Sequence, residues 1–254
     1  MPQNDKIPYQ PSIMTTLFIS DLHLTPERPD ITRAFQQFMT GKALEADTLY
    51  ILGDFFEVWI GDDDDAPYVL NIIKWLREYS DSGHQLFFMC GNRDFLIGDN
   101  FAKAAGATLL SDPTVIDLYG IPTVLMHGDS LCTQDLEYMA FRQMSRAPAW
   151  QTELLAKPLA ERRAIAQHLR QQSKSMSSMK AEDIMDVTPE EVVNTMNQLG
   201  ATRMIHGHTH RPNVHPLQLG DTQGERMVLG DWGEKLWWIE ATADSAPTLR
   251  QELI

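Results

Sequence analysis

The chain has 254 residues, of which 43% are hydrophobic and 22% are charged, and its formal net charge is −14. These proportions are typical of a soluble globular protein, and no apolar run approaches the roughly 18 residues that a membrane-spanning helix needs. The acidic charge argues against a general nucleic-acid binder, because an acidic surface repels phosphate backbones. The two cysteines, Cys90 and Cys132, are typical of a protein from a reducing compartment.

The first residues of the chain are polar and contain prolines, and they lack the basic stretch and apolar core of a secretory signal. We therefore expect the protein to be cytoplasmic. Residues 1–13 precede the first predicted strand, and we expect them to form a disordered extension, with Met14 as an alternative start.

The first half of the chain alternates short apolar runs with amphipathic segments, in which apolar residues recur at spacings of three and four. Gly83 is placed to end the second of these amphipathic segments. Because alternating strands and helices form parallel sheets that are buried on both faces, a parallel sheet is predicted for this half. Strands are predicted at 15–20, 48–52 and 85–90, and helices at 30–43, 67–82 and 98–105.

After residue 107 the pattern becomes rich in strands. Gly120-Ile121-Pro122 predicts a turn in this part, and Gly220-Asp221 and Gly233 mark turns between the C-terminal strands. The C-terminal strands at 213–218, 225–230 and 235–240, which are joined by these short turns, resemble antiparallel hairpins. Strands are predicted at 107–110, 114–118, 123–127, 203–205, 213–218, 225–230 and 235–240.

Residues 131–186 contain no strand pattern and resemble amphipathic helices, with apolar residues and arginines interleaved. Pro148 and Pro158 would divide this segment into short helices. From Met139 to Lys180 the basic residues exceed the acidic ones by six, whereas the rest of the chain carries −20. We expect an inserted helical cap whose cations meet an anionic partner, in preference to helices that only cover the core.

Seven side chains of the kinds that bind metals follow the ends of predicted strands. Asp21 and His23 are two residues apart and point to the same side of an extended strand end, and Gly53 lets the backbone turn. Carboxylate, amide and imidazole groups at successive strand ends can converge on one rim of a sheet, and this mixed set suits Mn, Fe, Zn or Mg. Two cations about 3.5–4 Å apart activate a bridging water and clamp phosphoryl oxygens, so a two-metal hydrolase is predicted. The seven residues are Asp21, His23, Asp54, Asn92, His127, His208 and His210.

The motifs around these residues resemble, in chain order, the five blocks of the calcineurin-like metallophosphoesterases: Asp21-Leu22-His23, Gly53-Asp54, Gly91-Asn92, His127-Gly128-Asp129 and Gly207-His208-Thr209-His210. Each block is common alone, but the five together are specific. The resemblance implies an α/β fold, an αββα sandwich formed by residues 14–254, in which the helical cap at about 131–186 is an insertion. It also implies two metal sites, one held by Asp21, His23, Asp54 and His210, and the other by Asp54 as a bridge with Asn92, His127 and His208.

One block departs from the broad family, because Arg93 stands where most members carry a histidine. Arginine does not act as a general acid at neutral pH, but it can neutralise charge that develops on phosphoryl oxygens. A leaving group that needs no strong protonation is then favoured, which indicates a phosphoanhydride in preference to a simple phosphomonoester. We expect Asn92, Arg93 and His208 to take part in catalysis.

Three further stretches, Ile60 to Asp64, Gly91 to Leu96 and Ile184 to Val187, narrow the resemblance to one branch of the family over nearly the whole chain. That branch consists of the lipid A pathway pyrophosphatases of Gram-negative bacteria. The resemblance implies hydrolysis of UDP-2,3-diacylglucosamine to UMP and 2,3-diacylglucosamine 1-phosphate (lipid X), with attack at the α-phosphorus and with two Mn²⁺ ions as the cofactor. It implies substrate contacts at Asn92, Arg93, Asp135, Ser173, Lys180 and His208, with Tyr138, Arg170 and Ser177 as further candidates.

The partners that follow from this interpretation are the diacylated nucleotide sugar and a membrane. Apolar faces of the cap would shelter two acyl chains while its cations face the diphosphate, and a segment that is both apolar and basic suits docking on an anionic membrane. We expect a monomer that associates peripherally with the cytoplasmic face of the inner membrane. Two other functions stay open: a soluble phosphodiesterase that acts on nucleotides, with the cap as a simple lid, and a non-catalytic scaffold of the same fold.

Several other polar residues are expected to have structural roles. We expect His206 to orient other groups in preference to binding metal, and the acidic run Asp62 to Asp65 to form a solvated loop. Asp94 and Asp129 follow candidate ligands, and we expect them to hold Arg93 or His127 in place.

Overall fold

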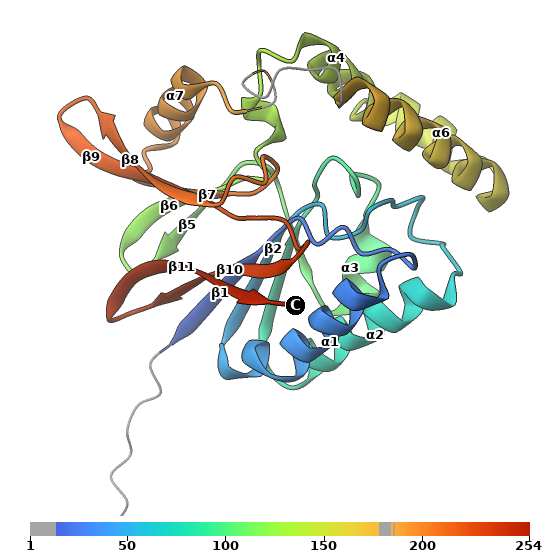
Figure 1. Ribbon diagram of the computed structural model, residues 1–254, viewed down its shortest axis with the longest axis horizontal. Helices are drawn as coiled ribbons and strands as arrows, with labels where there is room; N and C mark the ends of the chain where they lie inside the picture. The colour runs from blue at the N-terminus through green and yellow to red at the C-terminus, as the bar shows by residue number, and fades with distance from the viewer. Residues whose placement is uncertain (1–13, 178–183, 185) are drawn as a thin grey trace, which may run out of the picture.

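The computed structural model describes residues 14–177, 184 and 186–254, so the extension expected at 1–13 lies outside the described residues. Two β-sheets pack face to face, and helices lie on their outer faces (Figure 1). These layers form the αββα sandwich that the resemblance implies, and the predicted α/β fold class is confirmed.

The first sheet has six strands, in the order β11 (Ser245–Leu253), β10 (Lys235–Thr242), β1 (Thr15–Ile19), β2 (Thr48–Leu52), β3 (Gln85–Met89) and β4 (Thr108–Leu110). β1 to β4 run parallel to one another, whereas β10 lies antiparallel between β1 and β11. The parallel sheet predicted for the first half of the chain is therefore confirmed, and a C-terminal hairpin extends it at one edge.

The second sheet has five strands, in the order β5 (Thr114–Leu118), β6 (Ile121–Leu125), β7 (Arg203–His206), β9 (Thr222–Val228) and β8 (Asn213–Leu219). β8–β9 is an antiparallel hairpin, as predicted for the C-terminal strands, and β5–β6 is a second one. β7 runs parallel to both β6 and β9. The hairpin predicted across Gly233 is wrong, because β10 crosses to the first sheet and pairs with β1 and β11 instead of β9. β6 begins two residues earlier than predicted, because Ile121 and Pro122 already pair with β5 and the turn consists of Tyr119 and Gly120.

Strand β1 shows how one short segment supports two layers, because successive side chains of a strand point to opposite faces. Leu17 and Ile19 pack with Phe35 in the core between the first sheet and its helices. Phe18 faces the second sheet and stacks on Tyr50, with the ring centroids 5.0 Å apart. A continuous apolar run therefore marks a strand that is covered on both faces.

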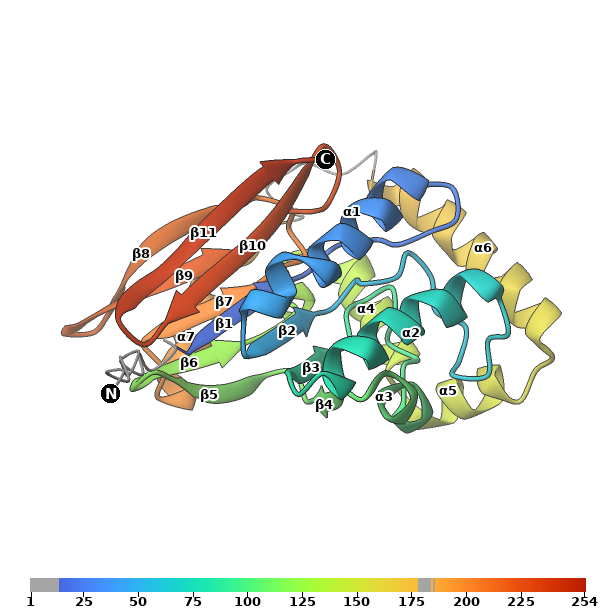
Figure 2. The ribbon, with the colours of Figure 1, turned by 90° about the horizontal axis from the view of Figure 1, so that it is seen from below.

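Helices α1 (Pro29–Thr40), α2 (Pro67–Asp81) and α3 (Asp99–Ala105) cover the outer face of the first sheet, and a 3₁₀ turn η1 (Lys42–Glu45) follows α1 (Figure 2). Helix α7 (Pro189–Leu199) covers the second sheet, where its Val192 and Met196 pack with Met204 of β7. The predicted helices thus lie against the parallel sheet, as its buried strands require.

One strand and one α-helix were not predicted from the sequence. β11 is an edge strand whose side chains are mostly exposed, so it has few apolar residues from which a pattern could be read. Helix α7 does carry start and stop signals, since Pro189 opens it and Gly200 follows it in the left-handed conformation with φ at 65°.

The cap is the segment 131–186, and its described residues form three helices on one side of the sandwich (Figure 1). They follow a 3₁₀ turn η2 (Asp129–Leu131) and are α4 (Leu136–Ser145), α5 (Pro148–Leu155) and α6 (Leu159–Ser177). As predicted, Pro148 opens α5 and Pro158 directly precedes α6. Among the residues that the structure describes, no helix is long and apolar enough to cross a membrane.

Candidate metal centre

The seven ligand-type residues follow the carboxyl ends of β1, β2, β3, β6 and β7. The loops after β1 and β2 run side by side, and the N–H of His23 donates to the carbonyl of Asp54 at 3.0 Å. The loops after β6 and β7 are joined in the same way, since the N–H of Gly207 donates to the carbonyl of His127 at 2.9 Å. Backbone hydrogen bonds therefore bring the loops together at one rim of the sandwich.

A first cluster consists of Asp21, His23 and His210, whose ligand atoms all lie within 4.8 Å of one another. Nε2 of His23 lies 3.2 Å from Nε2 of His210, and the latter lies 3.5 Å from Oδ1 of Asp21. Three donors from loops that are almost 190 positions apart in the sequence thus face one point.

A second cluster consists of Asp54, His127 and His208, whose ligand atoms also lie within 4.8 Å of one another. Oδ1 of Asn92 lies 2.8 Å from Nε2 of His127 and 2.8 Å from Nδ1 of His208. Oδ1 of Asp54 is 3.5 Å from Nε2 of His127, and its Oδ2 is 4.0 Å from Nε2 of His23 in the first cluster. Asp54 therefore lies between the clusters, where a bridging carboxylate is expected.

Five of the seven ligand-type residues have a left-handed backbone conformation, which costs a non-glycine residue roughly 1–2 kcal/mol. Hydrogen bonds hold two of them: Asp21 accepts from the N–H of His208 at 3.0 Å, and Asp54 accepts from the N–H of Arg93 at 2.8 Å. Strained backbone of this kind concentrates at functional sites. The φ angles are 56° at Asp21, 49° at His23, 50° at Asp54, 68° at His208 and 55° at His210.

Two glycines make the second cluster compact. A Cβ on Gly53, whose φ is 88°, would lie 2.5 Å from the backbone nitrogen of Gly91 and 2.7 Å from Nδ1 of His127. A Cβ on Gly91 would overlap Oδ1 of Asp54. The loops after β2 and β3 can therefore approach each other only because both positions are glycine.

Burial and neighbouring charges set the protonation of the centre without metal. Burial would raise the pKa of Asp21, but the contact with His210 and the charges of nearby histidines outweigh burial and hold that pKa well below its usual value. Burial and the charge of His127 lower the pKa of His208 to about 4. Burial would also lower the pKa of His127, but the carboxylates of Asp54, Asp129 and Asp21 and the contact with the Leu52 carbonyl together outweigh it, and the pKa rises to about 9.

The donor set fits two divalent cations. Nδ1 of His127 lies 2.9 Å from the carbonyl oxygen of Leu52, and a hydrogen bond there leaves Nε2 as the atom that faces the cluster. Carboxylates, imidazoles and an amide oxygen form a mixed set that Mn, Fe or Zn accepts. In the second cluster these donors converge from different loops, so a cation there would meet oxygen and nitrogen ligands together.

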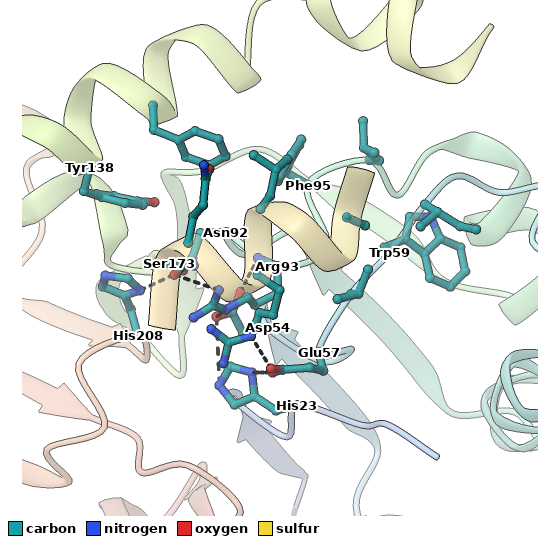
Figure 3. A pocket seen from close by; sticks show the side chains of 18 of the residues that line it. His23, Asp54, Glu57, Trp59, Asn92, Arg93, Phe95, Tyr138, Ser173 and His208 are labelled. Atoms are coloured by element: carbon teal, nitrogen blue, oxygen red, sulfur yellow. Dashed lines mark hydrogen bonds and ion pairs between the residues drawn. The ribbon is translucent and has the colours of Figure 1, made fainter. Parts of the chain in front are cut away.

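A cavity of about 590 Å³ joins the two clusters to the cap. At one end it is lined by ligand-type residues that include His23, Asp54 and Asn92. Its other end is mostly apolar and lies between the cap helices and the loops after β2 and β3, lined by Trp59, Ile60, Phe95, Trp150, Leu154 and Ile165. The same cavity therefore has an end with ligand-type residues and an apolar end. Figure 3 shows Phe95 and Trp59 on one side of the polar residues Asn92, Arg93 and Asp54.

The candidate substrate contacts lie around this cavity, which is lined by Asn92, Arg93, Asp135, Tyr138, Arg170, Ser173 and His208. Nη1 of Arg93 donates to Oγ of Ser173 at 3.4 Å, and Nε of Arg93 is buried with no hydrogen-bond acceptor among the described residues (Figure 3). Asp135 accepts from the N–H of Tyr138 at the start of α4. Lys180 lies outside the described residues, and Ser177 is the last residue of α6, with its side chain not described.

Asp94 and Asp129 have hydrogen-bond partners other than the expected side chains of Arg93 and His127. Asp94 is fully buried and accepts from the N–H of Gly91 at 2.6 Å and the N–H of Phe55 at 2.8 Å, so it fixes the backbone beside Asn92 and Asp54. Asp129 accepts from Nε of Arg142 at 2.8 Å and from the hydroxyl of Tyr138, and it therefore anchors helix α4 to the loop after β6.

The acidic run Asp62 to Asp65 is only in part the solvated loop that was expected. Asp62 accepts from the N–H groups of Gly98 and Phe101 at 3.0 Å each and thereby caps the start of α3. The carboxylates that follow it form ion pairs with Arg162 and Arg163 of α6. The run therefore anchors the first turns of α6 to the sandwich.

His206 lies outside both clusters, in agreement with its expected structural role. Its Nδ1 lies 2.8 Å from the carbonyl oxygen of Gly207, and its Nε2 lies 3.2 Å from Nη1 of Arg226. Burial and the charge of Arg226 lower the pKa of His206 to about 3. The neutral ring thus packs beneath the loop that carries His208.

Glu57 is a residue of the site that was not predicted from the sequence, although it lies three residues after Asp54. Its Oε1 forms an ion pair with Nε of Arg170 in α6, and its Oε2 lies 3.1 Å from Nδ1 of His23 (Figure 3). Burial would raise the pKa of Glu57, but His23 and Arg170 outweigh it and lower the pKa to about 2. No motif marks the residue, because its partner in the cap is 113 positions away.

Comparison with known families identifies the class of protein that this fold and site define. Residues 14–212 match the calcineurin-like phosphoesterase model, and the chain belongs to that family. Within the family it is 55% identical over 230 residues to the UDP-2,3-diacylglucosamine hydrolase of Cellvibrio japonicus, across 91% of this chain and 96% of the relative. It is 54% identical over 239 residues to the protein of the same name from Marinobacter nauticus, across 94% and 98% of the two chains. The resemblance to this branch of the family is therefore confirmed.

Proposed function

We propose that the chain hydrolyses the pyrophosphate bond of UDP-2,3-diacylglucosamine to UMP and 2,3-diacylglucosamine 1-phosphate, a step of lipid A biosynthesis. The observation that carries this proposal is the single cavity with metal-ligand clusters at one end and an apolar lining at the other. A substrate with a diphosphate and two acyl chains needs both ends. The names of relatives that are about 55% identical support the same reaction.

The residues of the two clusters would hold two divalent cations, with Asp54 between them. Asp21, His23 and His210 would complete one site, and Asn92, His127 and His208 the other. When bound, such cations lower the pKa of a water and neutralise phosphoryl charge. We propose Mn²⁺ as the native ion, because carboxylate, amide and imidazole donors suit it and because the family resemblance implies it.

In the proposed reaction a water attacks the α-phosphorus. A new P–O bond forms as the bond from that phosphorus to the bridging oxygen breaks, the sugar 1-phosphate departs with the bonding electrons, and the attacking water loses a proton to solvent. Arg93 supplies positive charge beside the reacting phosphorus, because its buried Nε has a free N–H and lies 3.9 Å from Oδ2 of Asp54. The departing phosphate is a stable anion, so no general acid is needed at the position of Arg93.

The cap would bind the rest of the substrate. We propose that Asp135, Tyr138, Arg170 and Ser173 contact the sugar and the phosphates, together with Ser177 and Lys180. The apolar end of the cavity would then take the acyl chains, since burying hydrocarbon contributes roughly 25 cal/mol per Å². Ser173 supports this arrangement, because it lies in α6 and already contacts the guanidinium of Arg93.

We also propose that the protein acts as a monomer at the cytoplasmic face of the inner membrane, where a diacylated substrate resides. Exposed apolar side chains on the cap support this, since Leu136 at the start of α4 is 76% exposed and Met144 and Leu155 are exposed nearby in the chain. Apolar side chains on a basic segment favour an anionic membrane surface.

Turnover of UDP-2,3-diacylglucosamine by the Mn²⁺-reconstituted chain, with the products identified by mass, tests the proposal. We expect UMP and the diacylated sugar 1-phosphate, and a much lower kcat/KM for the deacylated analogue. Equal rates with both substrates would refute the lipid proposal and favour a phosphodiesterase that acts on nucleotides. Absence of hydrolysis with any phosphate ester or anhydride would favour the non-catalytic scaffold.

A further inference from the structure

We propose that Glu57 is a positioning residue that couples the first cluster to the docking of helix α6, so that a cation in this cluster and a docked cap stabilise each other. The inference rests on the proposed function in one respect only, which is that the cluster of Asp21, His23 and His210 holds a divalent cation. Glu57 lies outside the motifs that carry the ligand-type residues, and it would connect metal binding in the first cluster to the docking of the cap.

Backbone hydrogen bonds fix Glu57 beside the cluster. The N–H of Leu24 donates to the carbonyl of Phe55 at 2.9 Å, and the N–H of Glu57 donates to the carbonyl of Leu24 at 3.1 Å. The loops after β1 and β2 are thus paired as far as Glu57, and Leu24 and Phe56 form a parallel bridge. The carboxylate extends from rigid backbone, so side-chain rotation is its main remaining freedom.

The two oxygens of Glu57 face two different partners. Oε2 lies 3.1 Å from Nδ1 of His23, while Oε1 forms an ion pair with Nε of Arg170 in α6. Nε2 of His23 points the other way, toward His210 at 3.2 Å. One carboxylate therefore connects the outer side of a candidate metal ligand to the cap.

The contact between Glu57 and His23 is close but is not aligned as a hydrogen bond, and the buried Nδ1 has no other polar partner among the described residues. A cation on the opposite ring nitrogen fixes the tautomer and makes Nδ1–H a stronger donor, which favours an aligned bond to a carboxylate. Glu57 held in this way is a fixed partner for Arg170, so ordering the pair costs less entropy. By linkage, a docked α6 then favours the cation by the same factor.

The first turns of α6 are anchored separately, and this makes the coupling local. Arg162 is almost fully buried and donates to Asp63 and to the carbonyl of Ile60 at 2.7 Å each. Arg170 lies about two turns further along the helix, and Ser173 lies one turn beyond Arg170 beside Arg93. The second half of α6 is therefore the part whose docking responds to the first cluster.

Metal binding provides the first test. Titration of the metal-free full chain with Mn²⁺ should show two binding events, and Glu57→Gln should weaken one of them by roughly 10–100-fold while leaving the other unchanged. The amide keeps the shape of the side chain but loses the charge. Glu225→Gln is a matched control, because Glu225 forms a 2.6 Å ion pair with Arg203 between β9 and β7, away from both clusters. Equal affinities for wild type and Glu57→Gln would overturn the coupling.

Hydrogen exchange provides the second test. In the wild type, Mn²⁺ should slow amide exchange at 166–173 but change it little at 160–164, next to the separate anchor. In Glu57→Gln the slowing at 166–173 should disappear. Exchange in the wild type that is independent of metal would overturn the inference.

Neither measurement uses substrate. If the wild type binds no metal, the proposed catalytic centre fails together with the coupling. If metal binding and coupling are found but the lipid is not hydrolysed, only the proposed function fails.

Discussion

Replacing Arg93 with alanine tests how the centre stabilises its transition state. The side chain contributes little to the fold, because its one side-chain hydrogen bond among the described residues, to Ser173, is 3.4 Å long, and its buried Nε has no acceptor in that part of the chain. Loss of one weak hydrogen bond costs at most about 1 kcal/mol, so urea denaturation of Arg93→Ala should give nearly the wild-type free energy of unfolding. Any large loss of activity is then a property of the reaction.

The magnitude follows from the position of the guanidinium. Its Nε lies 3.9 Å from Oδ2 of Asp54, the carboxylate between the two clusters, so it is aimed at the place where phosphoryl charge would develop. Removing one preorganised donor from such a site costs roughly 2.7–4 kcal/mol, which is about 10²–10³ in kcat. Arg93→Lys keeps a charge but loses the planar fork, and we expect an intermediate rate.

Steady-state kinetics of the Mn²⁺-reconstituted variants measure this effect. We expect kcat and kcat/KM of Arg93→Ala to fall together, because the interaction is made in the transition state. A rise in KM with kcat unchanged would refute the reasoning, since Arg93 would then contribute only to ground-state binding. Full loss of activity in Arg93→Lys would show that the reaction requires the planar guanidinium of arginine and that a positive charge alone is not enough.

Three further predictions concern the loops around the clusters. Asp94→Ala should lower the free energy of unfolding by about 2–6 kcal/mol in urea denaturation, because two buried N–H groups, of Phe55 and Gly91, lose their acceptor; wild-type stability would contradict this. Gly53→Ala should abolish Mn²⁺ binding to the second cluster in titrations, because its Cβ would lie 2.5 Å from the nitrogen of Gly91. Two binding events with wild-type affinities would refute this prediction. The pKa of His127, about 9 against an ordinary 6.5, predicts that the metal-free chain loses up to about 3 kcal/mol of unfolding free energy as pH rises from 6.5 to 9. Urea denaturation with chelator at both pH values measures this loss, and saturating Mn²⁺ should remove it because a metal ligand is already deprotonated.

The fold and the clusters of ligand-type residues could be predicted largely from local signals. β1 and β2 are fully covered strands whose continuous apolar runs end at Asp21 and Asp54, so both the strands and the residues after them stand out. The cap helices could be divided at Pro148 and Pro158 because proline acts on its own backbone. Strand positions and helix boundaries of this kind depend only on a residue and its neighbours, so they can be predicted from the sequence alone.

The rest depends on contacts between distant segments. The pairing of Glu57 with Arg170, and of Asp129 with Arg142, exists only because the cap folds back over the loops, and no spacing in the sequence records that approach. The acidic run after Gly61 was expected to face solvent for the same reason, since its arginine partners lie almost 100 positions later. Charge patterns indicate that such residues need partners but do not identify them.

The left-handed backbone conformation of five ligand-type residues also affects which substitutions the chain can accept. Glycine at any of these positions, such as Asp21 or His210, would relieve backbone strain and remove a charged or titratable group from a crowded centre. Such replacements belong to the stabilising substitutions whose usual cost is lost function, and the sandwich itself would not require the original side chains. The stability of the sandwich does not account for these five strained positions, whereas the chemistry proposed for the centre does.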